Sequence, residues 1–150
     1  MTEPDIRIKN LIDSCRDAVL ITTDSFGMPI PRVMNKVQDN ERSGGVFWFA
    51  TTRDSQKVKR INNNNRVSIM FYDAKTGDCA NVYGTALILT DTETKERFWN
   101  DGWKEYFPGG STDPMYCLIK VTPKKGDFFF NQENKSGVIS YFEGKIGDGP

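Results

Sequence analysis

Two basic side chains flank the expected start of a helix within Val46–Arg60, which reads VFWFATTRDSQKVKR. The helix is expected to be capped near Ser55, so that Arg53 and Lys57 lie at its N-terminus. A helix N-terminus already carries a partial positive charge and free N–H groups, so cations there are unfavourable unless an anion binds. A phosphate would reverse the sign of that interaction. The pattern leaves two interpretations open: a phosphate site, or two side chains that point into water while Asp54 offsets part of their charge.

The sequence contains no histidine, and this excludes several kinds of active site. Ser–His and Cys–His nucleophile pairs, histidine acid–base catalysis and histidine-ligated metals all require that residue. Any chemistry must come from carboxylates, Lys, Tyr, Cys or a bound cofactor, and no catalytic residue can be assigned. Cys15, Cys79 and Cys117 are far apart and form no CxxC motif, which is typical of reduced cytosolic thiols. We expect no metal site.

The charges of the chain balance, because lysine and arginine total 20 and aspartate and glutamate also total 20. Nucleic-acid-binding proteins normally carry a basic excess, so this balance argues against such a partner. A local basic cluster in a neutral chain fits a small anionic ligand better. The first residues do not form a signal peptide, and no apolar run reaches the roughly 18 residues of a membrane span. We therefore expect a cytoplasmic protein without a membrane partner.

The elements that must position these side chains are mostly strands, expected to form one domain over residues 1–150. Helical spacing predicts helices at Asp5–Asp17 and Ser55–Asn62, and Thr90 with Glu93 matches a capping box before a third. Apolar and β-branched runs bounded by turn residues predict the strands. The expected strands are Ala18–Thr23, Ile30–Gln38, Val46–Thr51, Arg66–Tyr72, Cys79–Leu89, Met115–Thr122 and Asp127–Asn131.

Local features refine this prediction. A polar loop is expected at Asp39–Gly45, and Gly84 inside a strand indicates a bulge or a close approach of another backbone. Pro123 separates the last two expected strands, and the apolar residues within 131–150 indicate a docking arm. Because strands and helices do not alternate regularly, a parallel βαβ fold is not expected. We predict a mainly β fold, an antiparallel six-stranded split β-barrel with flanking helices.

The order of several short motifs resembles that of a known family. PRVM (Pro31–Met34), VFWFATT (Val46–Thr52) and DSQKV (Asp54–Val58) resemble the pyridoxamine 5′-phosphate oxidase-like, FMN-binding split barrels. VYGTA (Val82–Ala86), the Trp99 and Trp103 pair, FPGG (Phe107–Gly110) and DP (Asp113-Pro114) are similar to the general stress protein 26 branch. The resemblance covers about Ile6 to Phe130.

This resemblance implies a homodimer with FMN bound at its interface. Arg32–Asn35 would run beside the flavin ring and its ribityl chain. Ala50 and Thr51 would meet the edge of the ring through backbone and hydroxyl groups. The phosphate would meet the residues of SQK, in agreement with the charge argument above. The cofactor-binding residues implied in this way are Arg32, Val33, Met34, Asn35, Phe49, Ala50, Thr51, Ser55, Gln56 and Lys57.

The chain also departs from the pyridoxamine phosphate oxidases proper. Those enzymes resemble this stretch but usually have an Arg where this chain has Gln56, and the Trp that packs on the flavin aligns with Phe129. Their C-terminal Arg and His have no counterpart, so that oxidation is not expected here. The resemblance implies a flavin-dependent oxidoreductase of unknown substrate. Two alternatives are a non-catalytic flavin-binding or stress-response module, and a site for another phosphorylated ligand such as pyridoxal phosphate or a deazaflavin.

Overall fold

In a computed structural model of the chain, the structure describes residues 1–37 and 45–142. The predicted polar loop Asp39–Gly45 therefore lies outside the described residues except for Gly45, and so does the end of the predicted arm from residue 143. None of the described helices is long and apolar enough to cross a membrane.

The first helix, α1 (Glu3–Ser14), begins two residues earlier than predicted because Thr2 and Asp5 form its capping box. Its buried side chains include Ile8, Leu11 and Ile12, at the predicted helical spacing. The helix ends at Ser14, and the Nζ of Lys36 donates to the carbonyl of Ile12 at 2.6 Å. The same carbonyl also accepts from the N–H of Cys15 at 3.2 Å, so both groups close the last turn.

The strands form one antiparallel sheet in the order β2-β1-β4-β5-β6-β3, with β7 paired to β6. Their bounds are β1 Asp17–Thr23, β2 Pro29–Asn35, β3 Phe47–Thr52, β4 Arg66–Tyr72, β5 Cys79–Leu89, β6 Tyr116–Phe130 and β7 Lys135–Val138. The two end strands, β2 and β3, meet through an isolated bridge between Lys36 and Phe49. The first six strands therefore curl into a split barrel, as predicted.

One predicted boundary is wrong, because β6 runs without interruption through Pro123. Pro123 pairs with Gly84 at the point where the β5–β6 register shifts. A residue without an N–H is tolerated at such a bulge. A Cβ added to Gly84 would lie 2.2 Å from the carbonyl oxygen of Thr122, so the close backbone approach predicted at this glycine is confirmed.

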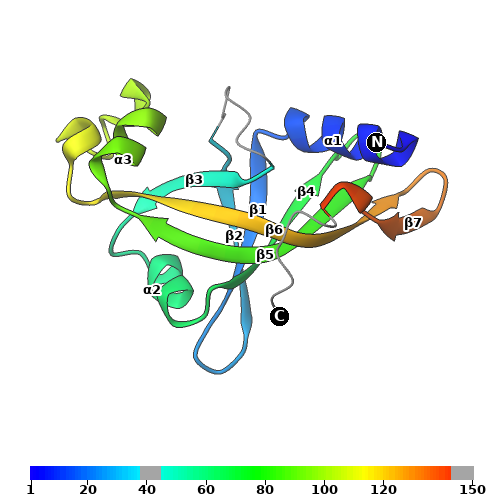
Figure 1. The fold of residues 1–150 in the computed structure, drawn as a ribbon, viewed down its shortest axis with the longest axis horizontal. Coiled ribbons are helices and arrows are strands. Elements are labelled where there is room, and N and C mark those ends of the chain that lie inside the picture. The colour runs from blue at the N-terminus through cyan, green and yellow to red at the C-terminus, as the bar shows by residue number, and fades with distance from the viewer. Residues whose placement is uncertain (38–44, 143–150) are drawn as a thin grey trace.

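The helices cover the ends of the sheet (Figure 1). Short helix α2 (Gln56–Asn63) follows β3, and α3 (Thr92–Phe98) lies at one end of the β5–β6 ribbon, with α1 and β7 at the other. The predicted capping box of α3 is wrong by one residue. Asp91 is the N-cap, and its carboxylate accepts from the backbone N–H and hydroxyl of Thr94.

Two hydrophobic clusters hold these elements together. The main core lies inside the barrel and includes Phe49, Ile69, Phe71 and Val82, all without exposed surface. The last described residues join it, since Ile139 and Phe142 are 0% and 1% exposed after β7 pairs with β6. A second, aromatic cluster attaches α3 and the following turns to the outer side of β3 and β6. Its buried members are Trp48, Phe98, Phe107, Tyr116 and Leu118.

Candidate functional site

The candidate site lies where the edges of β2 and β3 separate. These edges meet at the antiparallel bridge between Lys36 and Phe49, and Val37 N–H donates to the carbonyl of Trp48 at 2.9 Å. Within the described residues no further β2–β3 pair follows. The register of the bridge sets Asn35 opposite Ala50. The strands therefore face each other across an opening, which we call the split.

The main-chain groups of β3 alternate between β6 on one side and β2 on the other. Arg53 N–H donates to the carbonyl of Met115 at 2.7 Å. The odd-numbered residues of β3 therefore direct their main-chain N–H and C=O groups toward β6. In an antiparallel ladder these alternate with residues that point the other way. Trp48, whose carbonyl accepts from Val37, is one of the latter, and Ala50 is the next. The N–H and C=O of Ala50 thus point toward β2, beside the bridge at which the two strands still meet.

The strand residues implied by the resemblance occupy both sides of β2 and β3. Met34 and Phe49 belong to the barrel core, with 8% and 0% of their surface exposed, so only their main chains can reach a ligand. Thr51 is also buried. Val33 and Asn35 are exposed, and strand alternation puts them on the face of β2 opposite Arg32 and Met34. Arg32 is exposed and lies on the same face as Met34, beside the barrel interior.

Helix α2 contributes the remaining predicted residues at its first turn. Ser55 is the N-cap, and its Oγ accepts from the N–H of Val58 at 3.4 Å, as the predicted helix start requires. Gln56 is exposed, while Lys57 is half-buried. No acidic residue occupies the first turn of α2. Buried Val58 and Ile61 fix the helix against the barrel, so that its N-terminus is held beside the end of β3.

Arginine side chains from two elements act on Lys57. Burial lowers the pKa of Lys57, and the positive charges of Arg32 and Arg60 lower it further. Arg60 is anchored, because its Nε donates to the hydroxyl of buried Thr22 at 2.7 Å. The split thus brings together predicted Arg32 and Lys57 with Arg60, which the sequence reasoning did not include. Its spacing of three residues from Lys57 on one helix face could have indicated it.

Cys117, on β6 next to Thr51, carries a buried thiol. Cys117 pairs with Thr51 in the sheet, and burial raises its pKa to about 11. The charges of Arg53, Lys95 and Lys57 oppose that shift, so these cations lie around the thiol. Lys95 already donates to the carbonyl of Asp113 at 2.8 Å.

Within residues 1–37 and 45–142, the cations of the split form no ion pair with a carboxylate. Among the described residues, ion pairs form only between Arg7 and Asp78, Arg7 and Glu133, and Lys9 and Asp13, all away from the split. Asp54, which would offset part of the charge in the alternative interpretation, makes no ion pair with Arg53 or Lys57 in the described structure. The arrangement can hold an anion. In the same residues no group of three acidic, Cys or His side chains could hold a metal ion.

The tryptophan pair has a packing role. Trp99 and Trp103 meet edge to face with their ring centroids 5.9 Å apart. Both rings also contact the ring of Tyr116, at 5.3 and 5.9 Å. They close the second hydrophobic cluster and leave the split to other residues.

Comparison with known proteins places the whole chain in one group. Residues 3–148 match the family model described as "Pyridoxamine 5′-phosphate oxidase like". A Clostridium acetobutylicum protein related to general stress protein 26 is 26% identical, with a TM-score of 0.79 over 95% of this chain and 99% of that one. General stress protein 26 of Bacillus anthracis is also 26% identical, with a TM-score of 0.72 over 91% and 99% of the two chains.

A curated relative is longer than this chain. Protein bli-3 of Neurospora crassa is 29% identical over 107 residues, which are 65% of this chain and 51% of that protein. The chain thus spans about half the length of that relative.

Proposed function

Because the chain belongs to the pyridoxamine 5′-phosphate oxidase-like family, we propose that it binds FMN in the split and acts as a flavin-dependent oxidoreductase. The observation that carries this proposal is the meeting of Arg32, Lys57 and Arg60 without a carboxylate partner in the described residues. A phosphate monoester carries about −1.5 to −2 charges at neutral pH, which suits such a cluster. The donors and cations that are present therefore fit the flavin phosphate.

Different residues of the split would contact different parts of FMN. Lys57 and the free N–H groups of α2 would hold the phosphate, with Ser55 beside them. Gln56 would offer an amide in place of the usual guanidinium. The main-chain groups of Ala50 would meet the polar edge of the flavin ring, and Arg32 would lie along the cofactor. When bound, FMN supplies the hydride or electron transfer, while the protein supplies binding and electrostatics.

A second copy of the chain would complete the site. Strand β2 lies at the end of the sheet, and only one of its seven residues is buried. The exposed side chains on and before it include apolar ones, with Val33, Met28 and Phe26 at 67%, 59% and 94% exposure. Exposed apolar side chains grouped in this way support a protein–protein contact. We propose a homodimer in which this edge covers FMN.

The binding part of the proposal can be tested by spectroscopy. The purified protein is titrated with FMN and, in parallel, with riboflavin, which lacks the phosphate. We expect a saturating change in the visible spectrum at micromolar FMN and weaker binding of riboflavin. No binding of FMN at that concentration would contradict the proposal, and equal affinities would show that the phosphate is not recognised. Competition by pyridoxal phosphate tests whether the site prefers a different phosphorylated ligand.

A non-catalytic flavin-binding or stress-response role is the second candidate. The absence of histidine from the sequence supports it, since no residue stands out as an acid–base catalyst. Mixing the FMN-loaded protein with NADH or NADPH separates the two candidates. Rapid bleaching of the bound flavin would count against a pure binding role.

The cellular location is part of the proposal. Cys15, Cys79 and Cys117 are all free. Free thiols support a reducing compartment such as the cytoplasm.

A further inference from the structure

We propose that Lys95 of α3 is a positioning residue for ligand binding in the split, and that it acts through the loop of residues 107–115. This inference rests on the proposed function and deepens it, because it identifies what holds the turn before α2 in place. The contacts of the Lys95 side chain are with that loop and with Tyr116, so it acts on the ligand only through other residues.

Lys95 is a buried cation whose ammonium group has a main-chain partner. The residue is 7% exposed, and its Nζ donates to the carbonyl of Asp113 at 2.8 Å and lies 5.4 Å from the centre of the Tyr116 ring. Among the residues that the structure describes, no carboxylate forms an ion pair with it. Burial of a charge without an opposite charge is costly. A methionine would fill similar space without that cost, so the hydrogen bond to Asp113 indicates a role beyond packing.

The carbonyl that accepts from Lys95 belongs to a loop with many internal hydrogen bonds. The carboxylate of Asp113 accepts from the N–H of Gly109 and from the N–H of Met115, both at 2.9 Å. The Asp113 carbonyl also accepts from the N–H of Tyr116 at 3.1 Å, and the Tyr116 hydroxyl donates to the carbonyl of Lys95 at 2.9 Å. Lys95 and Tyr116 therefore fix the point at which the loop enters β6.

The same loop holds the turn that leads to α2. The carbonyl of Met115 accepts from the N–H of Arg53 at 2.7 Å, one residue beyond the β3–β6 ladder. The N–H of Ser55 donates to the carbonyl of Thr52 at 3.1 Å, which joins the turn to the N-cap of α2. Figure 1 shows α3 beside this end of β3 and β6. A continuous series of contacts thus connects Lys95 to Ser55, and we call it the Lys95 link.

The Lys95 link ends at the part of the split that would meet the phosphate. Ser55 and the free N–H groups of α2 follow the turn directly. A binding site is precise only when surrounding contacts hold its groups in place. Loss of the link should therefore weaken the contacts of the phosphate, whereas β2 and β3, beside the flavin ring, are held by their own ladders. The expected result is a smaller preference for FMN over riboflavin.

Parallel titrations with FMN and riboflavin test the role of Lys95. Lys95→Met removes the ammonium group and keeps a long side chain. We expect its FMN affinity to fall about threefold to thirtyfold, the range for substitutions that act through intervening contacts, while riboflavin affinity changes less than about twofold. Asp113→Ala breaks the link at its next member and should give the same pattern, including in the case that Lys95→Met does not fold. In the double variant the two losses should not add, because both break one link.

Two controls separate positioning from a general loss of stability. Lys104→Met is the matched control, because Lys104 is an exposed lysine shortly after α3. Phe98→Leu removes part of the buried ring contact with Trp48, whose centroid is 4.3 Å away, and leaves the Lys95 link intact. Both controls should keep the wild-type ratio of FMN to riboflavin affinity, although Phe98→Leu should lower the melting temperature.

Hydrogen exchange at the amide of Arg53 tests the link without any ligand. This exchange should be faster in Lys95→Met than in the wild-type protein and in Lys104→Met. The inference is overturned if this exchange is unchanged, if folded Lys95→Met and Asp113→Ala keep the wild-type ratio of affinities, or if Phe98→Leu lowers that ratio as much. Faster exchange in Lys95→Met, in a protein whose wild-type form does not bind FMN, would contradict the proposed function and support the link itself.

Discussion

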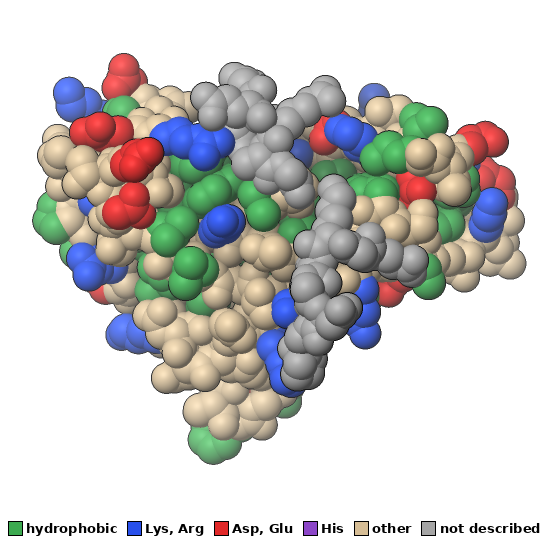
Figure 2. Space-filling model, viewed as in Figure 1, with side chains coloured by type: hydrophobic (Ala, Val, Ile, Leu, Met, Phe, Trp, Pro, Cys, Tyr) green, Lys and Arg blue, Asp and Glu red, His purple; other side chains and the backbone are tan. Residues whose placement is uncertain are grey.

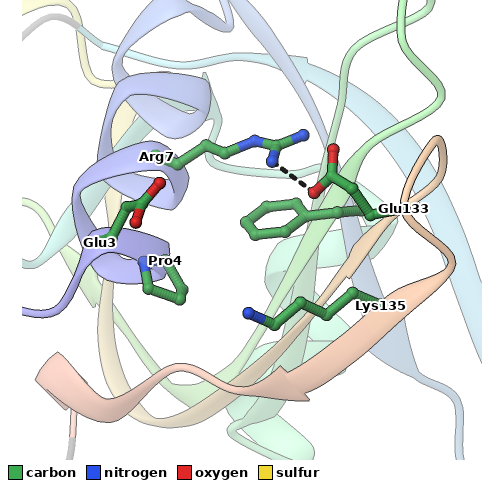
Figure 3. Close-up of a pocket in the computed structure, with 6 residues that line it drawn as sticks. Glu3, Pro4, Arg7, Glu133 and Lys135 are labelled. Atoms are coloured by element: carbon green, nitrogen blue, oxygen red, sulfur yellow. Dashed lines mark hydrogen bonds and ion pairs between the residues drawn. The ribbon is translucent and has the colours of Figure 1, made fainter.

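Charged side chains are arranged in opposite ways at the two ends of this molecule. At the corner between α1 and β7, Arg7 donates to Glu133 at 2.6 Å and to Asp78 at 3.0 Å, and its guanidinium stacks on Phe130 at 3.8 Å. Figure 3 shows Arg7 and Glu133 beside a hollow that Glu3, Pro4 and Lys135 also line. The volume of this hollow is about 100 Å³. At the split, Arg32, Arg53 and Lys57 have no carboxylate partner in the described part of the chain.

The difference separates charges that build the fold from charges that await a ligand. On the face drawn in Figure 2, acidic and basic side chains lie side by side at the α1 and β7 end. Arg7 there pairs with two carboxylates of the chain, so the corner joins α1 to the sheet. The cations of the split raise the energy of the ligand-free protein and lower that of a complex with an anion. Substitutions in the first region should therefore change stability, and substitutions in the second should change binding.

The largest expected effect is on the stability of the corner. The buried carboxylate of Asp78 accepts from the backbone N–H of Asn131 at 2.9 Å and from Arg7. Asp78→Ala leaves both donors without this partner and should lower the free energy of unfolding by about 2–4 kcal/mol, after allowance for the solvent exposure of Arg7. Urea unfolding measures this loss.

The exposed pair of Lys9 and Asp13 on α1 supplies the control for that experiment. Asp13→Ala should cost less than about 0.5 kcal/mol, because exposed helix pairs contribute little. FMN affinity should stay at the wild-type value in both variants. A large fall in FMN affinity for Asp78→Ala, with the fold intact, would remove the distinction between the two regions.

The next effect is on ligand binding at the split. Lys57→Ala should weaken FMN binding by about 1.5–3 kcal/mol, the range for a hydrogen bond to a charged group. Lys59→Ala on the same helix is the matched control, because Lys59 is exposed and lies on another side of α2. Titration monitored by flavin absorbance gives both affinities. Equal affinities for the two variants would place the phosphate elsewhere.

A fall in pH should lower the stability that the corner between α1 and β7 gives to the fold. Burial would raise the pKa values of Asp5 and Asp78, but hydrogen bonds from Ser140 and Thr2 to Asp5, and from Asn131 and Arg7 to Asp78, outweigh it and hold both values below 3.8. Groups whose pKa is lower in the folded state stabilise it above their unfolded pKa, and this contribution disappears as the pH falls through the folded value.

Asp5→Asn isolates one of these carboxylates. Asp5 accepts from the Ser140 hydroxyl at 2.5 Å and from the backbone N–H of Thr2, so the variant should lose about 1 kcal/mol at neutral pH. Its stability should then fall less steeply than that of the wild-type protein as the pH drops below about 4. Parallel urea titrations at neutral and acidic pH test this, and identical pH profiles would show that Asp5 is not responsible.

Much of the fold could be predicted from local patterns. β4 and β5 have the predicted bounds because each is a continuous apolar or β-branched run between turn residues. The break predicted at Pro123 was wrong because its tolerance depends on Gly84, which lies 39 positions away in the sequence and opposite it in the sheet. A local rule cannot include such a partner.

The candidate site was predictable only in part for the same reason. The helix start at Ser55 and the unusual cation at Lys57 follow from local sequence alone. The convergence of Arg32 and Arg60 on Lys57 depends on the curling of β2 toward β3 and on the anchoring of Arg60 by Thr22. Those are long-range contacts, and the sequence shows only that the side chains are basic.

The smallest expected effect is a gain of stability at the split, opposite in sign to the loss expected at the corner between α1 and β7. The pKa of Lys57 is lowered by burial and by Arg32 and Arg60, so at neutral pH its charge destabilises the folded, ligand-free protein. Lys57→Gln should therefore raise the ligand-free stability by a few tenths of a kcal/mol, the scale of a like-charge contact near the surface. The gain should begin to shrink as the pH rises past the folded pKa of Lys57 and should be lost once the pH exceeds the higher pKa of the unfolded chain, where the side chain is neutral in both states. With saturating FMN the order should reverse, since only wild-type protein gains the full binding energy. Thermal unfolding of both proteins, with and without FMN, tests this, and a loss of ligand-free stability in the variant would show that Lys57 serves the fold.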